Sequence, residues 1–189
     1  MKRTFTALAL AAAALATLPG CIPLAVTGAG AAALMASDRR TTGMYIEDEN
    51  IELKILGSKE QYGPAHYNAT SYNRRVLLTG EAPDEKTRTR LEDSVKAIPS
   101  VREVVDEIQV AGASSLASRG SDALITSNVK ARMVNNPKFS ASHVKVVTEA
   151  GTVYLMGLVS PAEGDAAVEI ARTTSGVVRV VKVFEYIGK

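Results

Sequence analysis

The stretch "HVKVVTEAGTVYLMGLVSPAE", residues 143–163, decides the fold because the chain holds a second version of it, "HYNATSYNRRVLLTGEAPDE", at residues 66–85. His66 aligns with His143, and Gly80 aligns with Gly157 at the same spacing. Another shared pattern follows in both copies: "PSVREVVDEIQV" at 99–110 and "SGVVRVVKVFEYI" at 175–187. A pattern that recurs in this way predicts two similar structural units in one chain.

Each unit is expected to begin with a helix and to continue with a β-hairpin. In the second unit, apolar residues recur at helical spacing from Ile125 to Met133, and Asp122 is the predicted N-cap. Asp48 is its predicted counterpart in the first unit. The segment "VKVVTEAGTVYLMGLV" that follows is rich in β-branched residues around a Glu-Ala-Gly turn, which predicts two antiparallel strands.

A second helix and a third strand complete each unit. The "SPAE" segment at 160–163 combines a capping box with Pro at the first helical position, and "VVRVVKVFEYI" then reads as a strand. Gly80 and Gly157 each interrupt a predicted strand, which indicates a structural role such as a bulge or a close backbone approach. The predicted fold is therefore α+β, with two tandem α-β-β-α-β units, each a small two-layer sandwich.

The N-terminus carries a targeting pattern. Lys2 and Arg3 precede a short apolar run, which is typical of a secretory signal peptide. The run ends in "LPGC", residues 18–21, which resembles a bacterial lipobox and implies cleavage before Cys21 and lipidation of that residue. The alternative is an unmodified Cys21 at the end of an ordinary signal. Lipoproteins retained in the inner membrane usually carry Asp after the cysteine, so Ile22 points to the outer membrane.

The chain is thus expected to have five parts. These are a signal peptide (1–20), a lipidated cysteine and tether (21–45), a first domain (46–112), a linker (113–120) and a second domain (121–189). The 22–36 segment is rich in small residues, so it fits either a linker or a short self-associating helix.

Composition excludes several classes of function. A single cysteine rules out an internal disulfide framework and a cysteine-based zinc site, and a formal charge of +2 gives no reason to expect nucleic acid. His66 and His143 occupy equivalent positions of the repeat, so both are interpreted as structural or incidental rather than as metal ligands. We find no arrangement of nucleophile, base and orienting group, and the sequence predicts no catalytic residue, no metal and no cofactor.

The repeat, with "VYLMGLV" before a capped helix and "SGVVRVV" after it, resembles the BON domain. Two such domains behind a lipobox, with "DRRTTG" at 38–43, are similar to dual BON-domain outer-membrane lipoproteins. The resemblance implies binding of phospholipid, support of outer-membrane integrity and a link to the division site. One departure is Leu124, which stands where the family pattern leads us to expect Trp.

Charge and helical periodicity suggest where a membrane would bind. Residues 46–112 hold 9 basic and 13 acidic residues, whereas residues 121–189 hold 8 basic and 6 acidic ones. An anionic lipid surface therefore favours the second domain. On its first predicted helix, a face distinct from the core stripe carries the candidate lipid-binding residues Leu124, Ser127, Lys130, Ala131 and Val134, with Arg132 as a further cation. The alternatives are ordinary surface or contact with the first domain.

The resulting expectation is a non-enzymatic outer-membrane lipoprotein on the periplasmic face that binds anionic phospholipids, such as phosphatidylglycerol and cardiolipin, through its second domain. The alternative is an adaptor that contacts proteins of envelope assembly or division. An enzyme is the third and least supported class.

Overall fold

The two halves of the chain contain the same elements in the same order. In this computed structural model, residues 38–188 are described. The predicted signal peptide, Cys21 and the 22–36 segment lie outside the described residues. The first half consists of α3 (Thr42–Gly57), a 3-10 turn (Lys59–Tyr62), β1 (His66–Tyr72), β2 (Arg75–Ala82), α4 (Glu85–Lys96) and β3 (Glu103–Val110).

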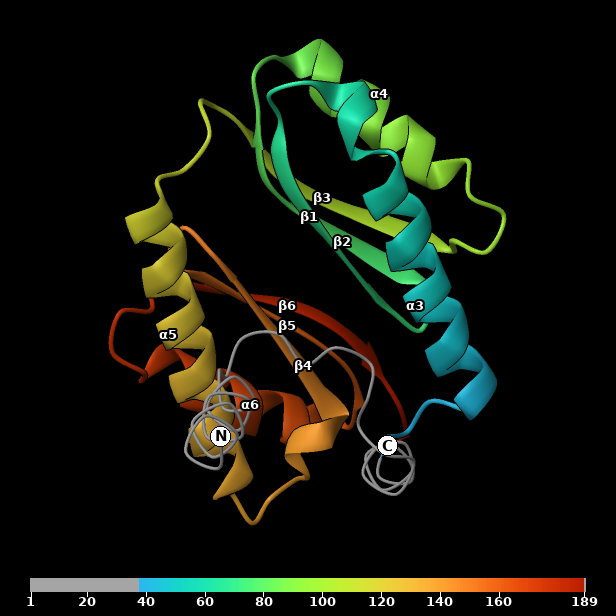
Figure 1. Ribbon diagram of the computed structural model, residues 1–189. Coiled ribbons are helices and arrows are strands. Elements are labelled where there is room, and N and C mark those ends of the chain that lie inside the picture. The colour runs from blue at the N-terminus through green and yellow to red at the C-terminus, as the bar shows by residue number, and fades with distance from the viewer. Residues whose placement is uncertain (1–37, 189) are drawn as a thin grey trace, which may run out of the picture. The chain divides into compact units, whose positions relative to one another are not determined.

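The second half repeats this succession, which confirms the predicted α+β fold. It consists of α5 (Leu116–Val134), a 3-10 turn (Ala141–His143), β4 (Val144–Glu149), β5 (Thr152–Val159), α6 (Pro161–Arg172) and β6 (Arg179–Tyr186). In each half the second strand is central: it pairs antiparallel with the hairpin strand before it and parallel with the strand after the second helix. The helices of each half cover one face of their own sheet (Figure 1).

The repeated glycines lie where the hairpin strands come into very close contact. A Cβ added to Gly80 would lie 2.2 Å from the carbonyl oxygen of His66, and one added to Gly157 would lie 2.3 Å from that of His143. Gly80 also has a φ of +110°, a conformation that side chains with a Cβ rarely adopt. Any larger residue at either position would push the two strands apart.

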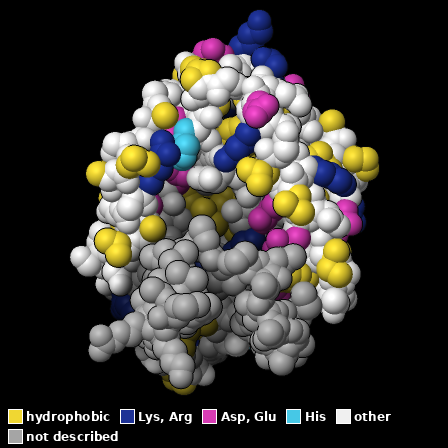
Figure 2. Space-filling view, in the orientation of Figure 1, with side chains coloured by type: hydrophobic (Ala, Val, Ile, Leu, Met, Phe, Trp, Pro, Cys, Tyr) yellow, Lys and Arg dark blue, Asp and Glu magenta, His cyan; other side chains and the backbone are white. Residues whose placement is uncertain are grey.

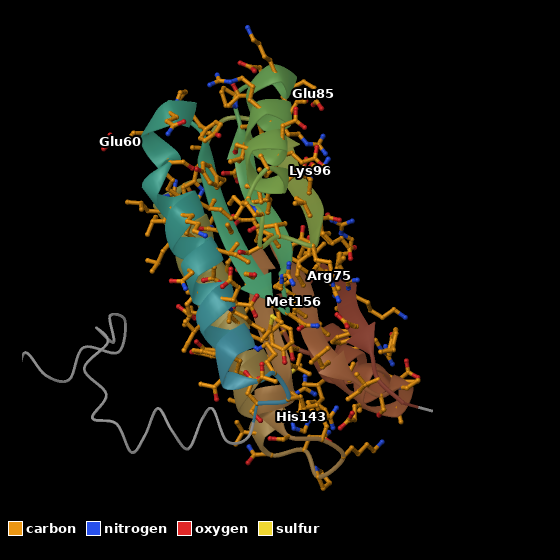
Figure 3. All side chains as sticks on the ribbon, turned by 90° about the vertical axis from the view of Figure 1, so that its right-hand side faces the viewer. Glu60, Arg75, Glu85, Lys96, His143 and Met156 are labelled. Carbon is orange, nitrogen blue, oxygen red and sulfur yellow. The ribbon has the colours of Figure 1, made fainter. Side chains whose placement is uncertain are left out.

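The two sheets pack against each other through the faces that their helices leave open. Residues alternate along the central strands, so Val76 and Leu78 face the helices while Leu77 faces the other half. Leu77 joins Tyr72 with Tyr154, Met156 and Val183 of the second half in one buried cluster. Met156 and Arg75 lie at this junction in Figure 3. The central strands are therefore buried on both faces, and the described chain has four layers: helices, sheet, sheet, helices.

Polar contacts border this apolar interface. The Arg75 guanidinium donates to the carbonyl oxygen of Phe184 at 2.9 Å, and Asn73 Nδ2 donates to Glu185 at 2.9 Å. At the opposite border Lys145 Nζ lies 2.9 Å from Glu52. Polar contacts from the β1–β2 turn and from α3 thus hold the second domain against the first.

The prediction that Asp48 and Asp122 cap helices is wrong. Both lie inside their helices with 2% and 7% of their surface exposed, because their carboxylates accept hydrogen bonds from the turn of the following hairpin. Asp122 accepts from the backbone N–H groups of Ala150 and Gly151 at 3.0 and 2.8 Å. Asp48 accepts from the corresponding turn of the first hairpin.

The first helices consequently begin earlier than the sequence pattern suggests. Thr41 caps α3 and Ser115 caps α5, each through a side-chain oxygen that accepts a backbone N–H. The predicted linker 113–120 is therefore helical from Leu116, and the predicted tether 21–45 is helical from Thr42. The sequence pattern places these helix starts too late. An Asp before an apolar stripe looks the same in sequence whether its carboxylate accepts from its own helix N-terminus or from a distant turn.

The segment at 38–40 is also bound to both domains rather than acting as a tether. The Arg39 guanidinium makes two 2.7 Å bonds to the Glu163 carboxylate and donates to the carbonyl oxygen of Leu158 at 2.8 Å. Arg40 bonds to Asp48 at 2.7 Å and lies over the Tyr72 ring, 4.1 Å from its centroid. The chain that precedes the first domain is therefore tied to α6 of the second.

Candidate membrane-facing helix of the second domain

Helix α5 has one face in the core and an opposite face directed to solvent. Ile125, Val129 and Met133 are at most 6% exposed and pack on the sheet of the second domain. At 1.5 Å per residue, the 19 residues of α5 span about 28 Å. The helix thus presents a long outer surface that takes no part in the core formed by residues 38–188.

That outer surface carries large apolar side chains. Leu124 and Val134 are 67% and 70% exposed, and Leu116, at the start of the helix, is 82% exposed. At 100° per residue these three lie within one quadrant, with Ala131 and Ser127 between them. Figure 2 shows hydrophobic side chains standing among polar atoms on the surface over this helix. We call Leu116, Leu124, Ser127, Ala131 and Val134 the outer stripe of α5.

The three polar residues predicted to bind lipid differ in their position and contacts. Lys130 is exposed beside the outer stripe, and partial burial of its ammonium group together with the nearby Lys145 lowers its pKa. Ser127 lies within the stripe but its hydroxyl donates to the carbonyl oxygen of Ala123 at 2.9 Å. Arg132 points away from the stripe: Nη1 donates to Ile170 at 2.8 Å and Nη2 to Thr173 at 3.0 Å. Arg132 thus ties α5 to the C-terminal end of α6.

The equivalent helix of the first domain has a similar shape but the opposite charge. On α3, Leu53 and Leu56 are 62% and 56% exposed, so this helix also presents apolar side chains to solvent. Helix α3 holds four acidic residues and one basic residue, whereas α5 holds three basic residues and one acidic residue. That one acid is Asp122, which is buried against the hairpin turn. An anionic surface would therefore be attracted to α5 and repelled by α3.

Leu116 is the member of the outer stripe that sequence reasoning missed. It falls in the predicted linker, because the helix was expected to start only at Asp122. The available signal is Ser115, a good N-cap residue one position ahead of Leu116. Among residues 38–188, no helix is both long and apolar enough to cross a bilayer.

Two repeated α-β-β-α-β units with paired sheets define a tandem α+β domain protein, and comparison with known families agrees. The BON domain model matches residues 47–112 and 121–188, so the chain belongs to the BON-domain family. Together with the relatives below, this match confirms a dual BON-domain protein of the DolP type.

Three relatives are similar to this chain over most of its length. It is 37% identical over 174 residues to a Haemophilus influenzae protein named outer membrane lipoprotein DolP, with 90% of each chain covered. It is 33% identical to a 21 kDa hemolysin of Actinobacillus pleuropneumoniae, with 79% of each chain covered. It is 26% identical to osmotically-inducible protein Y of Escherichia coli, covering 75% of this chain and 73% of that one.

Proposed function

We propose that this protein is a non-enzymatic lipoprotein, anchored through Cys21 in the outer membrane with its domains on the periplasmic side. The support is the signal-like N-terminus, the lipobox resemblance of "LPGC" and a relative named an outer membrane lipoprotein. Each buried CH₂ of an acyl chain contributes about 0.8 kcal/mol, so an anchor with several chains would be permanent.

We further propose that α5 binds anionic phospholipid, such as phosphatidylglycerol or cardiolipin. One observation carries this proposal: the outer stripe runs along the whole helix, with Leu116, Leu124 and Val134 each at least 67% exposed. Exposed Lys130 lies beside the stripe, and the one acid of the helix, Asp122, is buried on the opposite face. Apolar side chains would enter the interface while the ammonium group meets phosphate.

The expected energies are small but sufficient. Burying a whole leucine side chain contributes about 1.5–3 kcal/mol, so the two-thirds of Leu124 that is exposed would contribute about 1–2 kcal/mol. One lysine near an anionic surface adds about 1 kcal/mol. Because the anchor already holds the domain close to the bilayer, even this weak affinity would favour patches rich in anionic lipid. Support of membrane integrity and accumulation at the division site would follow from that preference.

The test is co-sedimentation of residues 22–189, made without the anchor, with phosphatidylglycerol vesicles. The double variant Leu124→Glu, Lys130→Glu should bind at least about 30-fold more weakly, since it removes about 2–3 kcal/mol and adds repulsion. The matched control is Leu53→Glu, because Leu53 is similarly exposed on α3. Unchanged binding by the double variant, or an equal loss with Leu53→Glu, would refute the site.

A second candidate function is that of an adaptor for envelope assembly or division proteins, and α3 is the observation that favours it. Its exposed apolar side chains, Ile46, Leu53 and Leu56, are accompanied by the acidic residues Glu47 and Glu49, which suits a protein partner better than an anionic bilayer. Crosslinking in cells separates the two candidates. Protein adducts from α3 without lipid adducts from α5 would favour the adaptor.

A further inference from the structure

Three potential metal ligands meet at the border between the two domains. They are His66 at the start of β1, Glu81 in β2 and Glu149 at the end of β4, and their ligand atoms all lie within 4.8 Å of one another. His66 and Glu81 are direct neighbours across the β1–β2 pair, and His66 Nδ1 is 3.3 Å from Glu81 Oε2. Glu149 comes from the second domain, where Asn68 Nδ2 of the first donates to it at 3.2 Å.

The two carboxylates are nearly buried without a matching cation. Glu81 is 8% and Glu149 is 9% exposed. Among residues 38–188, no lysine or arginine forms an ion pair with either of them. Two ionised carboxylates that are this close together and this well buried destabilise the fold unless a cation or a proton lies between them.

The Nδ1 atom of His66 lies beside these carboxylates without a hydrogen-bond partner in the described part of the chain. Nδ1 of His66 is buried and has no hydrogen-bond partner among the described residues, and the same holds for Nδ1 of His143. A buried polar atom without a partner is rare in folded proteins and calls for a bound water or ion. A solvent-filled hollow of about 290 Å³ lies alongside, lined in part by His66, Asn68 and Glu149, and gives an ion a way in.

We propose that His66, Glu81 and Glu149 bind a divalent transition-metal ion, best matched by zinc, that links the two domains. Imidazole nitrogen and carboxylate oxygen are ligands that zinc takes at about 2.0–2.2 Å. Two such bonds at a tetrahedral angle separate their ligand atoms by about 3.3–3.5 Å. The His66–Glu81 separation of 3.3 Å already meets this requirement. A small side-chain movement would bring in Glu149, and water would fill the fourth position.

The corresponding place in the second domain is occupied by a cation from the chain itself. His143, the repeat equivalent of His66, has Nδ1 at 3.6 Å from Glu163. The Arg39 guanidinium makes two 2.7 Å bonds to that same carboxylate. In the second domain arginine neutralises this histidine–carboxylate pair, whereas beside His66 and Glu81 lies a second carboxylate, Glu149 of the second domain, with no ion-paired arginine among residues 38–188. His143 is accordingly a matched control for His66.

The experiment is a Zn²⁺ titration of the full chain, purified in detergent without a histidine tag and stripped with EDTA, by calorimetry and thermal unfolding. We expect one ion per chain and a melting temperature raised by about 5–10 °C at 100 times the Kd. His66→Ala and Glu149→Gln should each weaken binding at least about tenfold, while His143→Ala leaves it unchanged. No zinc binding at 100 µM, or binding lost only in His143→Ala, overturns the proposal.

Thermal unfolding of the metal-free variant separates a loss of zinc binding from a loss of folding. Glu149→Gln replaces one of two facing carboxylates with an uncharged amide of the same shape, so the metal-free variant should melt no lower than the wild type at pH 7. A variant that melts normally and no longer responds to Zn²⁺ supports the site. A variant that melts normally and responds like the wild type contradicts it.

Discussion

Removal of the Arg39 guanidinium should lower stability in a pH-dependent way. The bidentate bond from Arg39 is the main reason why the pKa of Glu163 falls from 4.5 to about 2. At 1.36 kcal/mol per unit, that shift has an upper value of about 3.4 kcal/mol. Arg39 shares the effect with Ser160, and its side chain is 27% exposed, so solvent screening reduces the Arg39 share to about 1–2 kcal/mol.

The sign follows from the depressed pKa. A carboxylate whose folded pKa lies below its unfolded value stabilises the fold above about pH 4.5, and this contribution disappears as the pH falls toward about 2. Urea unfolding of Arg39→Ala at pH 7 should therefore give a free energy of unfolding about 1–2 kcal/mol below wild type. The difference should shrink steadily between pH 5 and pH 2. Only the small share from the bond to the Leu158 carbonyl should then remain.

Arg172 provides the matched control. It also pairs with a glutamate of α6, Glu169, but both side chains are more than half exposed. Arg172→Ala should cost less than about 0.5 kcal/mol, because exposed pairs contribute little. An Arg39→Ala difference that is equal at pH 7 and pH 3, or no larger than that of Arg172→Ala, would refute this account of the 38–40 segment.

Further stability measurements test the packing. Gly80→Ala should destabilise by at least about 2 kcal/mol, whereas Gly43→Ala, with open space around its Cα, should be neutral or slightly stabilising; equal effects would contradict the close approach of β1 and β2. Asp122→Ala should cost about 1–3 kcal/mol through the two N–H groups left unpaired in the β4–β5 turn, and a loss below 0.5 kcal/mol would show that water replaces the carboxylate. Met156→Ala should cost about 2–5 kcal/mol, since Met156 is fully buried between the sheets, and a negligible cost would mean that the sheets do not stay packed in solution.

The repeat made the secondary structure of each domain predictable, because its periodicities are local. The helix stripe at Ile125, Val129 and Met133 and the capping box at 160–163 appear in the structure as read from the sequence. The roles of Asp48 and Asp122 are hidden from the local pattern because their partners lie in the hairpin turns, 25 or more residues away along the chain. A local sequence pattern cannot distinguish an aspartate that caps its own helix from one that accepts hydrogen bonds from a distant turn.

The contacts between the domains were harder to see, although one signal was present. The run "VYLMGLV" in β5 is continuously apolar, which is typical of a strand buried on both faces. Only one of those faces is needed for a two-layer domain, so the run already indicated a second covering layer. The cluster of His66 with Glu149 had no such signal, because its members are brought together by domain packing rather than by spacing.

The most direct test of the central claim is a map of the lipid-facing residues. Residues 22–189, labelled with ¹⁵N, would be added to phosphatidylglycerol micelles that carry a spin-labelled lipid, and backbone NMR signals would report proximity to lipid. The account predicts the strongest broadening at Leu124, Ser127 and Ala131 on α5, with Leu53 and Leu56 on α3 unaffected. Broadening that is centred on α3, or absent from α5, would contradict membrane binding through the second domain.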